Sequence, residues 1–104
     1  MDAVSVIDRC NRVLADHYGL RFRGLFLYGS VARGEAKDCS DIDLFVLLAG
    51  PLDYFDELKK IVDLLYPVQL QSERLISAKP VGYHQFQSGA THLYRTAKRE
   101  GTAV

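Results

Sequence analysis

The residues whose types and spacing could support chemistry lie between positions 29 and 43. Gly29 and Ser30 follow an apolar run, and Asp41 and Asp43 begin the next one. Residues two apart in a strand project from the same face, so the two aspartates form a carboxylate pair while Ile42 points into the core. Adjacent carboxylates repel each other unless a cation lies between them, and Mg²⁺ prefers one or two carboxylates together with substrate phosphates. This spacing therefore predicts a magnesium site for a phosphate-bearing ligand.

The Gly-Ser pair predicts the phosphate-binding half of the same site. Gly29 lets the backbone approach a ligand closely, and Ser30 at the start of a helical turn offers N–H and hydroxyl donors. An isolated Asp-x-Asp is more often a solvated strand end, and an isolated Gly-Ser is a turn, but their occurrence together favours a site. A P-loop is excluded because Glu35 and Ala36 stand where that motif requires Lys and Ser or Thr.

Two segments carry a resemblance to a known family, LFLYGSVARG at residues 25–34 and SDIDL at residues 40–44. They closely resemble the minimal nucleotidyltransferases, small bacterial members of the DNA polymerase beta superfamily. The resemblance is strong over residues 25–48 and weaker over the helix after Pro51 and over residues 94–101. It implies a single nucleotidyltransferase domain over residues 1–104 that transfers a nucleoside monophosphate, usually AMP from ATP, with the help of Mg²⁺.

The resemblance also assigns expected roles to individual residues. Asp41 and Asp43 would bind Mg²⁺ and carry the catalysis, and Gly29 and Ser30 would hold the triphosphate. The further nucleotide-binding residues that it implies are Arg33 and Ser40. Arg33 is a common part of the family signature, and both phosphate contact and support of the loop remain open for it.

Catalysis in the superfamily usually needs a third carboxylate on the next strand, and the sequence does not show one clearly. The strand expected at residues 68–71 offers Gln69 and Gln71 on its polar face. A neutral amide can provide a carbonyl ligand but cannot take a proton. Glu73 has the same parity as Gln69 and Gln71, so it would supply the third carboxylate if the strand extended to residue 73.

Two functions follow from these observations. The first is a Mg²⁺-dependent nucleotidyltransferase acting on a protein or small-molecule acceptor. By resemblance, such small proteins are often encoded beside a HEPN-type helical protein and act as the antitoxin that adds AMP to it. The second is a catalytically impaired nucleotide-binding or partner-pairing module of the same fold.

Apolar periodicity predicts the elements that position these residues. We expect a helix from residue 3 to a stop at Gly19, strands at residues 24–28 and 41–48, and a helix from Pro51 to Pro67. A third strand is expected at residues 68–71, irregular structure at 72–88, and a last helix from about residue 88 to Gly101. This order predicts an α/β (α+β) fold, a small mixed sheet with helices on one face and the other face left for chemistry.

Composition excludes several classes of protein. Thirteen basic residues balance thirteen acidic ones, and a net charge of zero disfavours general nucleic-acid binding. The longest apolar run, residues 44–48, is too short for a membrane span, so we expect a cytoplasmic protein. Cys10 and Cys39 are too few for a disulfide framework and are expected to be reduced thiols.

Overall fold

The computed structural model describes residues 2–29 and 41–104. The predicted nucleotide-binding residues Ser30, Arg33 and Ser40 lie outside these ranges. The described elements are, in order, α1 (Ala3–Tyr18), the 3-10 helix η1 (Gly19–Arg21), β1 (Phe22–Tyr28), β2 (Ile42–Leu48), α3 (Tyr54–Gln71), β3 (Ile76–Gly82), α4 (Tyr83–Ser88), α5 (His92–Glu100) and β4 (Thr102–Ala103).

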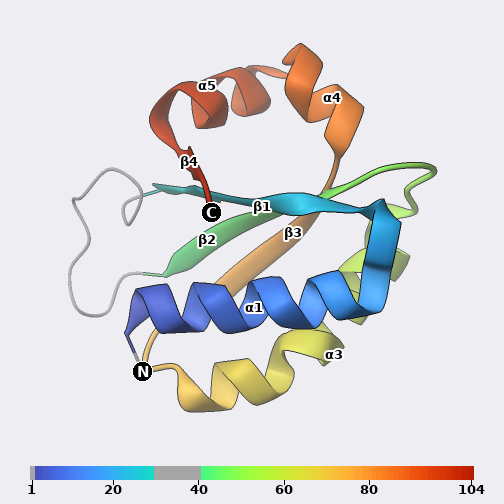
Figure 1. Ribbon diagram of the computed structural model, residues 1–104. Helices are drawn as coiled ribbons and strands as arrows, with labels where there is room; N and C mark the ends of the chain where they lie inside the picture. The colour runs from blue at the N-terminus through green and yellow to red at the C-terminus, as the bar shows by residue number, and fades with distance from the viewer. Residues whose placement is uncertain (1, 30–40) are drawn as a thin grey trace.

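These strands form one four-stranded sheet in the order β3-β2-β1-β4. β1 pairs antiparallel with β2 and β4, whereas β2 pairs parallel with β3. The small mixed sheet with helices that the sequence predicted is therefore confirmed. Helices α1 and α3 lie on one side of the sheet, and α4 and α5 lie on the other (Figure 1).

The larger core lies between the sheet and the helices α1 and α3. Helix α1 begins where the side chain of Asp2 accepts a hydrogen bond of 2.8 Å from the backbone N–H of Ser5. It ends at Gly19, as expected, and its apolar stripe packs on alternate residues of β1 and β2. Ile42, predicted to point into the core, is fully buried there, and so is Leu44.

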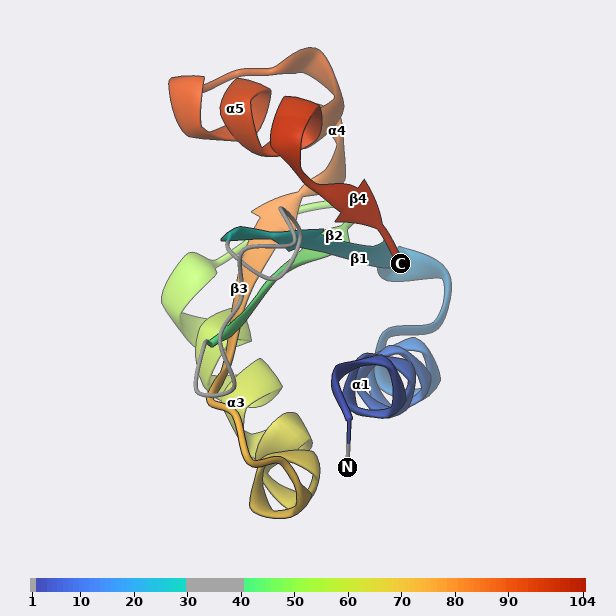
Figure 2. The same ribbon diagram turned by 90° about the vertical axis from the view of Figure 1, so that its left-hand side faces the viewer.

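A second, smaller core lies on the opposite face of the sheet, so the prediction of helices on one face only is wrong. The intervening residues of β1 and β2 are also apolar, and they would be exposed without cover. Phe86 of α4 packs at 4.9 Å, between ring centroids, from Phe26, and Ala97 of α5 is buried in the same cluster. Figure 2 shows α4 and α5 as a layer above the sheet, away from α1 and α3.

Helix α3 continues through Pro67 to Gln71, so the strand predicted at residues 68–71 is wrong. Val68 lies on the same helix face as Ile61 and Leu65 and is 1% exposed. Burial of this side chain in the larger core offsets the hydrogen bond that a proline removes from a helix. Residues 68–71, in which apolar and polar residues alternate, therefore form the last turn of a helix and not a strand.

The region predicted to be irregular, residues 72–88, contains the real third strand and a further helix. β3 runs parallel to β2, and the backbone N–H of Ile42 donates a 2.8 Å hydrogen bond to the carbonyl of Leu75 at the start of this pairing. Lys79, Pro80 and Gly82 are poor strand residues, and their strand conformation depends on the partner strand. Within the described ranges, no helix has both the length and the apolar character needed to cross a membrane.

Candidate functional site

Gly29 and Asp43 lie against each other where β1 ends and β2 begins. Tyr28, the last residue of β1, is paired with Asp43 across the antiparallel ladder, and Gly29 follows it directly. Gly29 has a φ of +80°, and a Cβ at this position would collide with the Oδ2 atom of Asp43 and lie 3.3 Å from its Cγ. The structure thus places the carboxylate of Asp43 directly beside the turn that the sequence marks as phosphate-binding.

Asp41 and Asp43 flank the fully buried Ile42 at the beginning of β2. Asp41 is exposed and lies one residue ahead of the strand, while Asp43 is half-buried within it. Asp43 has the same parity as Phe45, which belongs to the smaller core, so it faces the side of the sheet that carries α4 and α5. The carboxylate of Asp43 therefore lies at the margin of the apolar cover on that face.

The aromatic ring of Tyr28 lies next to the carboxylate of Asp43. Its ring stacks on Phe45 with 4.1 Å between the ring centroids. Burial, and secondarily the negative charge of Asp43, raises the pKa of Tyr28 to about 12. The phenol is therefore neutral at physiological pH and can donate a hydrogen bond at the site.

Helix α5 also reaches this end of the sheet. A cavity of about 250 Å³ is lined by Tyr28 and Gly29 from β1 and its end, and by residues of α5 that include Thr96 and Glu100. In Figure 1 the C-terminal end of α5 lies above the C-terminal end of β1. Thr96 and Glu100 were missed from the sequence because only tertiary packing brings them to Gly29.

The geometry agrees with the comparisons with known proteins. The family model for the nucleotidyltransferase domain of polymerase beta matches residues 10–99. The chain belongs to this nucleotidyltransferase family. A comparison with curated protein sequences gave no significant match.

Two solved structures have the fold of this nucleotidyltransferase domain. One is the spectinomycin adenyltransferase of Enterococcus faecialis with ATP and spectinomycin, which is similar with a TM-score of 0.65 and 18% identity over 98% of this chain. The chain covers 48% of that adenyltransferase, about half its length. The other is a nucleotidyltransferase, described as putative, from Sulfolobus solfataricus, with a TM-score of 0.54 and 14% identity, covering 97% of this chain and 84% of that one.

The resemblance to the superfamily predicts a third carboxylate on the strand that follows the aspartate pair, and in the structure that strand is β3. β3 lies beside β2, and its register pairs Asp43 with Ser77 and Phe45 with Lys79. Ser77 therefore occupies the place next to Asp43 on the same face of the sheet, and residues 76–82 contain no Asp or Glu. A serine hydroxyl can donate or accept a hydrogen bond, but it does not carry the charge of a carboxylate.

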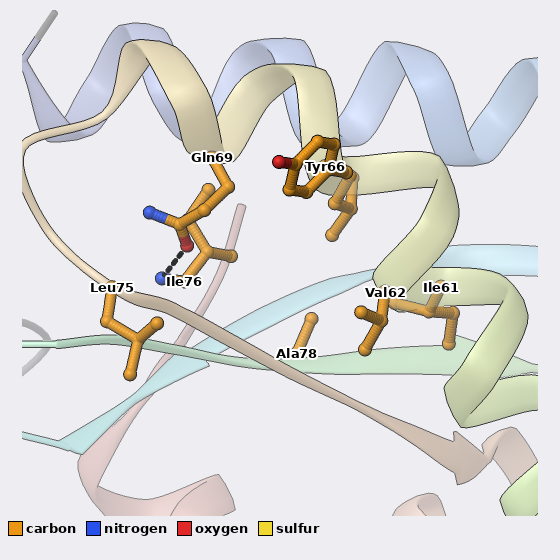
Figure 3. Close-up of a pocket in the computed structure, with 8 residues that line it drawn as sticks. Ile61, Val62, Tyr66, Gln69, Leu75, Ile76 and Ala78 are labelled. Atoms are coloured by element: carbon orange, nitrogen blue, oxygen red, sulfur yellow. Dashed lines mark hydrogen bonds between the residues drawn. The ribbon is translucent and has the colours of Figure 1, made fainter.

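The three residues considered for this role from the sequence lie elsewhere. Gln69 belongs to α3, and its side chain accepts a 2.7 Å hydrogen bond from the backbone N–H of Ile76, as Figure 3 shows. Gln71, also in α3, accepts a hydrogen bond from the guanidinium of Arg9, and Glu73 is exposed in the turn before β3. Gln69 and Gln71 therefore hold helix α3 in place, and the interpretation of them as the polar face of a strand is wrong.

The residue types at the site are those that bind magnesium in proteins. Asp41 and Asp43 supply two carboxylates, and Mg²⁺ is usually bound by one or two carboxylates completed by substrate phosphates and water. Within residues 2–29 and 41–104, no three His, Cys, Asp or Glu side chains are grouped closely enough to hold a metal ion by themselves. A nucleotide would therefore have to complete the coordination shell.

Proposed function

We propose that this nucleotidyltransferase domain binds ATP with Mg²⁺ and transfers AMP to an acceptor. The observation that carries the proposal is the contact between Gly29 and the carboxylate of Asp43. It brings a turn suited to phosphate and a carboxylate suited to Mg²⁺ into one place, which is what nucleotidyl transfer requires from a protein.

In this proposal one group of residues binds the nucleotide and a second group holds Mg²⁺. Gly29 leaves its backbone open to the triphosphate because it has no Cβ, and Ser30 would add its N–H and hydroxyl. Arg33 and Ser40 are proposed as further nucleotide-binding residues. Asp41 and Asp43 would hold Mg²⁺, which when bound would neutralise charge on the phosphates. In the transfer, the hydroxyl oxygen of an acceptor bonds to the α-phosphorus and its proton passes to solvent water. The bond from the α-phosphorus to the oxygen that bridges to the β-phosphorus breaks, and pyrophosphate leaves.

The acceptor is proposed to be a protein or a small molecule. The adenyltransferase with the same fold was solved with ATP and spectinomycin, and this chain covers 48% of it. A HEPN-type helical protein is our proposed protein acceptor, with this chain as the antitoxin of a toxin-antitoxin pair. The family resemblance supports this partner.

A second function, nucleotide binding or partner pairing without catalysis, is favoured by one observation. Ser77 stands beside Asp43 where the superfamily usually has its third carboxylate. A site that binds the nucleotide but lacks a proton acceptor would keep affinity for ATP and lose the rate of transfer. A nucleotide-binding module of this kind therefore differs from the transferase in turnover, whereas a module that only pairs with a partner differs in nucleotide binding as well.

Calorimetry of ATP binding with and without Mg²⁺ tests the nucleotide site that the transferase and the nucleotide-binding module share. We expect Mg²⁺-dependent binding by the wild type and its loss in the double variant Asp41→Asn/Asp43→Asn. Asp8→Asn/Asp16→Asn is a matched control, because it removes the same charge from two exposed positions of α1. Binding that survives the change at Asp41 and Asp43 would contradict the proposed site.

Transfer itself is tested by incubating the protein and a co-expressed HEPN-type partner with ATP labelled on the α-phosphate. We expect label on the partner with the wild type and none with Asp43→Asn, while the complex of the two proteins persists. A wild-type protein that binds MgATP and pairs with its partner but transfers no label is the pairing module instead. A labelled partner with Asp43→Asn would refute the assigned role of that carboxylate.

A further inference from the structure

One flank of α3 exposes large apolar side chains that neither core uses. Phe55, Val62 and Tyr66 are 78%, 57% and 58% exposed. They are separated by seven and four residues, about two turns and one turn, so they form one stripe along the helix. Leu75, just before β3, is 57% exposed and extends this apolar surface toward the sheet. Isolated exposed apolar residues are ordinary, but a continuous stripe of this kind indicates an interaction surface.

A groove runs beside the stripe, between α3 and β3. It has a volume of about 260 Å³ and is lined by apolar side chains, among them Ile61, Val62, Leu65, Tyr66, Leu75 and Ala78. Figure 3 shows Val62 and Tyr66 projecting from α3 on one side and Leu75 on the other. The only hydrogen bond drawn there, between Gln69 and Ile76, lies at one end. The groove therefore suits apolar side chains from a partner.

The neighbouring edge of the sheet argues against a partner that adds a strand. β3 is at the edge of the sheet in the described part of the chain, and an open edge can pair with a foreign strand. Its centre carries the exposed Lys79 and then Pro80, which has no N–H to donate. These residues are typical of edges protected from strand pairing, so a partner must bind through the helix.

Charged side chains beside the stripe indicate what kind of helix could bind to it. Lys59 and Asp63 are exposed on the solvent side of the stripe, and neither has an ion-pair partner within the residues that the structure describes. Phe55 and Tyr66 lie about 16 Å apart along α3, and the point midway between them falls between Lys60 and Ile61. A two-fold axis through this midpoint would place a second α3 helix antiparallel to the first, so that the two ends of the stripe lie opposite each other.

We propose that this face binds a second copy of the chain, with the two α3 helices antiparallel about a two-fold axis. Phe55 then lies opposite Tyr66 of the second copy, and the aliphatic stem of Lys59 lies opposite the second copy's Val62. The ammonium group of Lys59 comes within one residue of Asp63 of the second copy, and the symmetry makes each contact twice. The interface has apolar side chains at its centre and paired charges at its rim.

The exposed area indicates a reversible dimer. An aromatic side chain buries roughly 150–250 Å² when it is fully covered. At the exposures of Phe55 and Tyr66, the two rings contribute roughly 270 Å² per copy, or about 540 Å² for the pair, before Val62, Leu75 and Lys59 are added. Interfaces below about 1,200 Å² are typical of weak complexes, so we expect a dissociation constant in the micromolar range.

Sedimentation velocity at low salt, from about 1 to 500 µM protein, tests the dimer. We expect the mass to rise from monomer to dimer with concentration, and Val62→Glu to abolish the rise. Val4→Glu is the matched control, since Val4 is 76% exposed on α1 and lies outside the stripe. Circular dichroism verifies that both variants are folded. A monomer at every concentration, or a dimer that Val62→Glu leaves intact, would overturn the proposal.

A charge exchange tests the antiparallel arrangement. Lys59→Glu and Asp63→Lys alone each place like charges opposite one another, and each should weaken the dimer about fivefold or more. The double variant Lys59→Glu/Asp63→Lys restores opposite charges across the axis, and its dissociation constant should return to within about threefold of the wild type. Failure of the double variant to recover would refute the arrangement.

Discussion

Replacement of Gly29 by alanine is the most direct test of the geometry at the candidate site. Gly29 has a φ of +80°, and its added Cβ would collide with the carboxylate of Asp43. Two costs therefore arise, one from the backbone conformation and one from the displaced side chain. Gly19→Ala separates them, because Gly19 also has a positive φ, +58°, but no atom lies within 4 Å of the place its Cβ would take.

The expected magnitudes follow from these two terms. A positive φ costs an alanine about 1–2 kcal/mol, which applies at both positions. Moving the carboxylate of Asp43 out of its rotamer adds about 0.5–1.5 kcal/mol at Gly29 alone. We therefore expect Gly29→Ala to lower the free energy of unfolding by about 1.5–3.5 kcal/mol and Gly19→Ala by about 1–2 kcal/mol.

Urea unfolding and calorimetry of MgATP binding measure the two consequences. With a slope of about 2 kcal/mol/M, a loss of about 2 kcal/mol moves the unfolding midpoint by roughly 1 M. A displaced carboxylate should weaken MgATP binding by about tenfold or more, which corresponds to about 1.4 kcal/mol. Gly19→Ala should leave the affinity unchanged, because Gly19 lies at the end of α1, away from the site.

Equal responses of the two glycines to substitution would refute a role for the contact between Gly29 and Asp43. An equal loss of stability in both variants, together with unchanged MgATP affinity in Gly29→Ala, would show that the contact with Asp43 has no functional consequence. A loss of affinity in Gly19→Ala of the same size would show that the effect arises from general destabilisation.

Three further predictions concern the rest of the fold. Glu57 is buried, forms an ion pair with Arg21 at 2.9 Å and accepts a hydrogen bond of 3.4 Å from the hydroxyl of Tyr18. Glu57→Gln should therefore lower the free energy of unfolding, measured in urea, by about 2 kcal/mol. Asp56→Asn, a change at an exposed position of the same helix, should alter it by less than about 0.5 kcal/mol. Burial, and secondarily Glu57, raises the pKa of Tyr18 to about 12, so the folded protein keeps a proton that the unfolded chain loses above pH 10. Stability should then fall between about pH 10 and 12, and Tyr18→Phe should make this fall shallower; an unchanged pH dependence would contradict it. Phe86 is 2% exposed in the smaller core, so Phe86→Ala should cost about 3–5 kcal/mol, and a cost below about 1 kcal/mol in the same assay would show that α4 does not close that face.

The sequence predicted an element correctly wherever the residues within that element define its ends and its buried face. The side chain of Asp2 and the glycine at position 19 define both ends of α1, and its apolar stripe defines its buried face. The apolar runs that form β1 and β2 could be identified because a continuous run bounded by turn residues is typical of a covered strand. Much of the candidate site was predicted for the same reason, since Gly29 and Asp43 lie at the ends of those two runs.

Local pattern failed at residues 67–82, where burial decided the structure. Pro67 predicts the end of a helix, but Val68 completes the buried face of α3 and extends it to Gln71. The real third strand contains Lys79 and Pro80, which disfavour strands by themselves, and it forms because β2 presents an edge for parallel pairing. Parallel pairing joins residues far apart in the sequence, so no short window carries its signal.

The sequence by itself determined the family, the two central strands and the positions of Gly29 and Asp43 at the ends of those strands. These depend on residue types and short spacings, which act through backbone conformation and alternation within a strand. Only the tertiary structure decided that Ser77 lies beside Asp43, that α5 brings Thr96 and Glu100 to Gly29, and that helices cover both faces of the sheet. Those neighbours are selected by the pairing of distant strands and by the burial of apolar area, and both are properties of the whole folded chain.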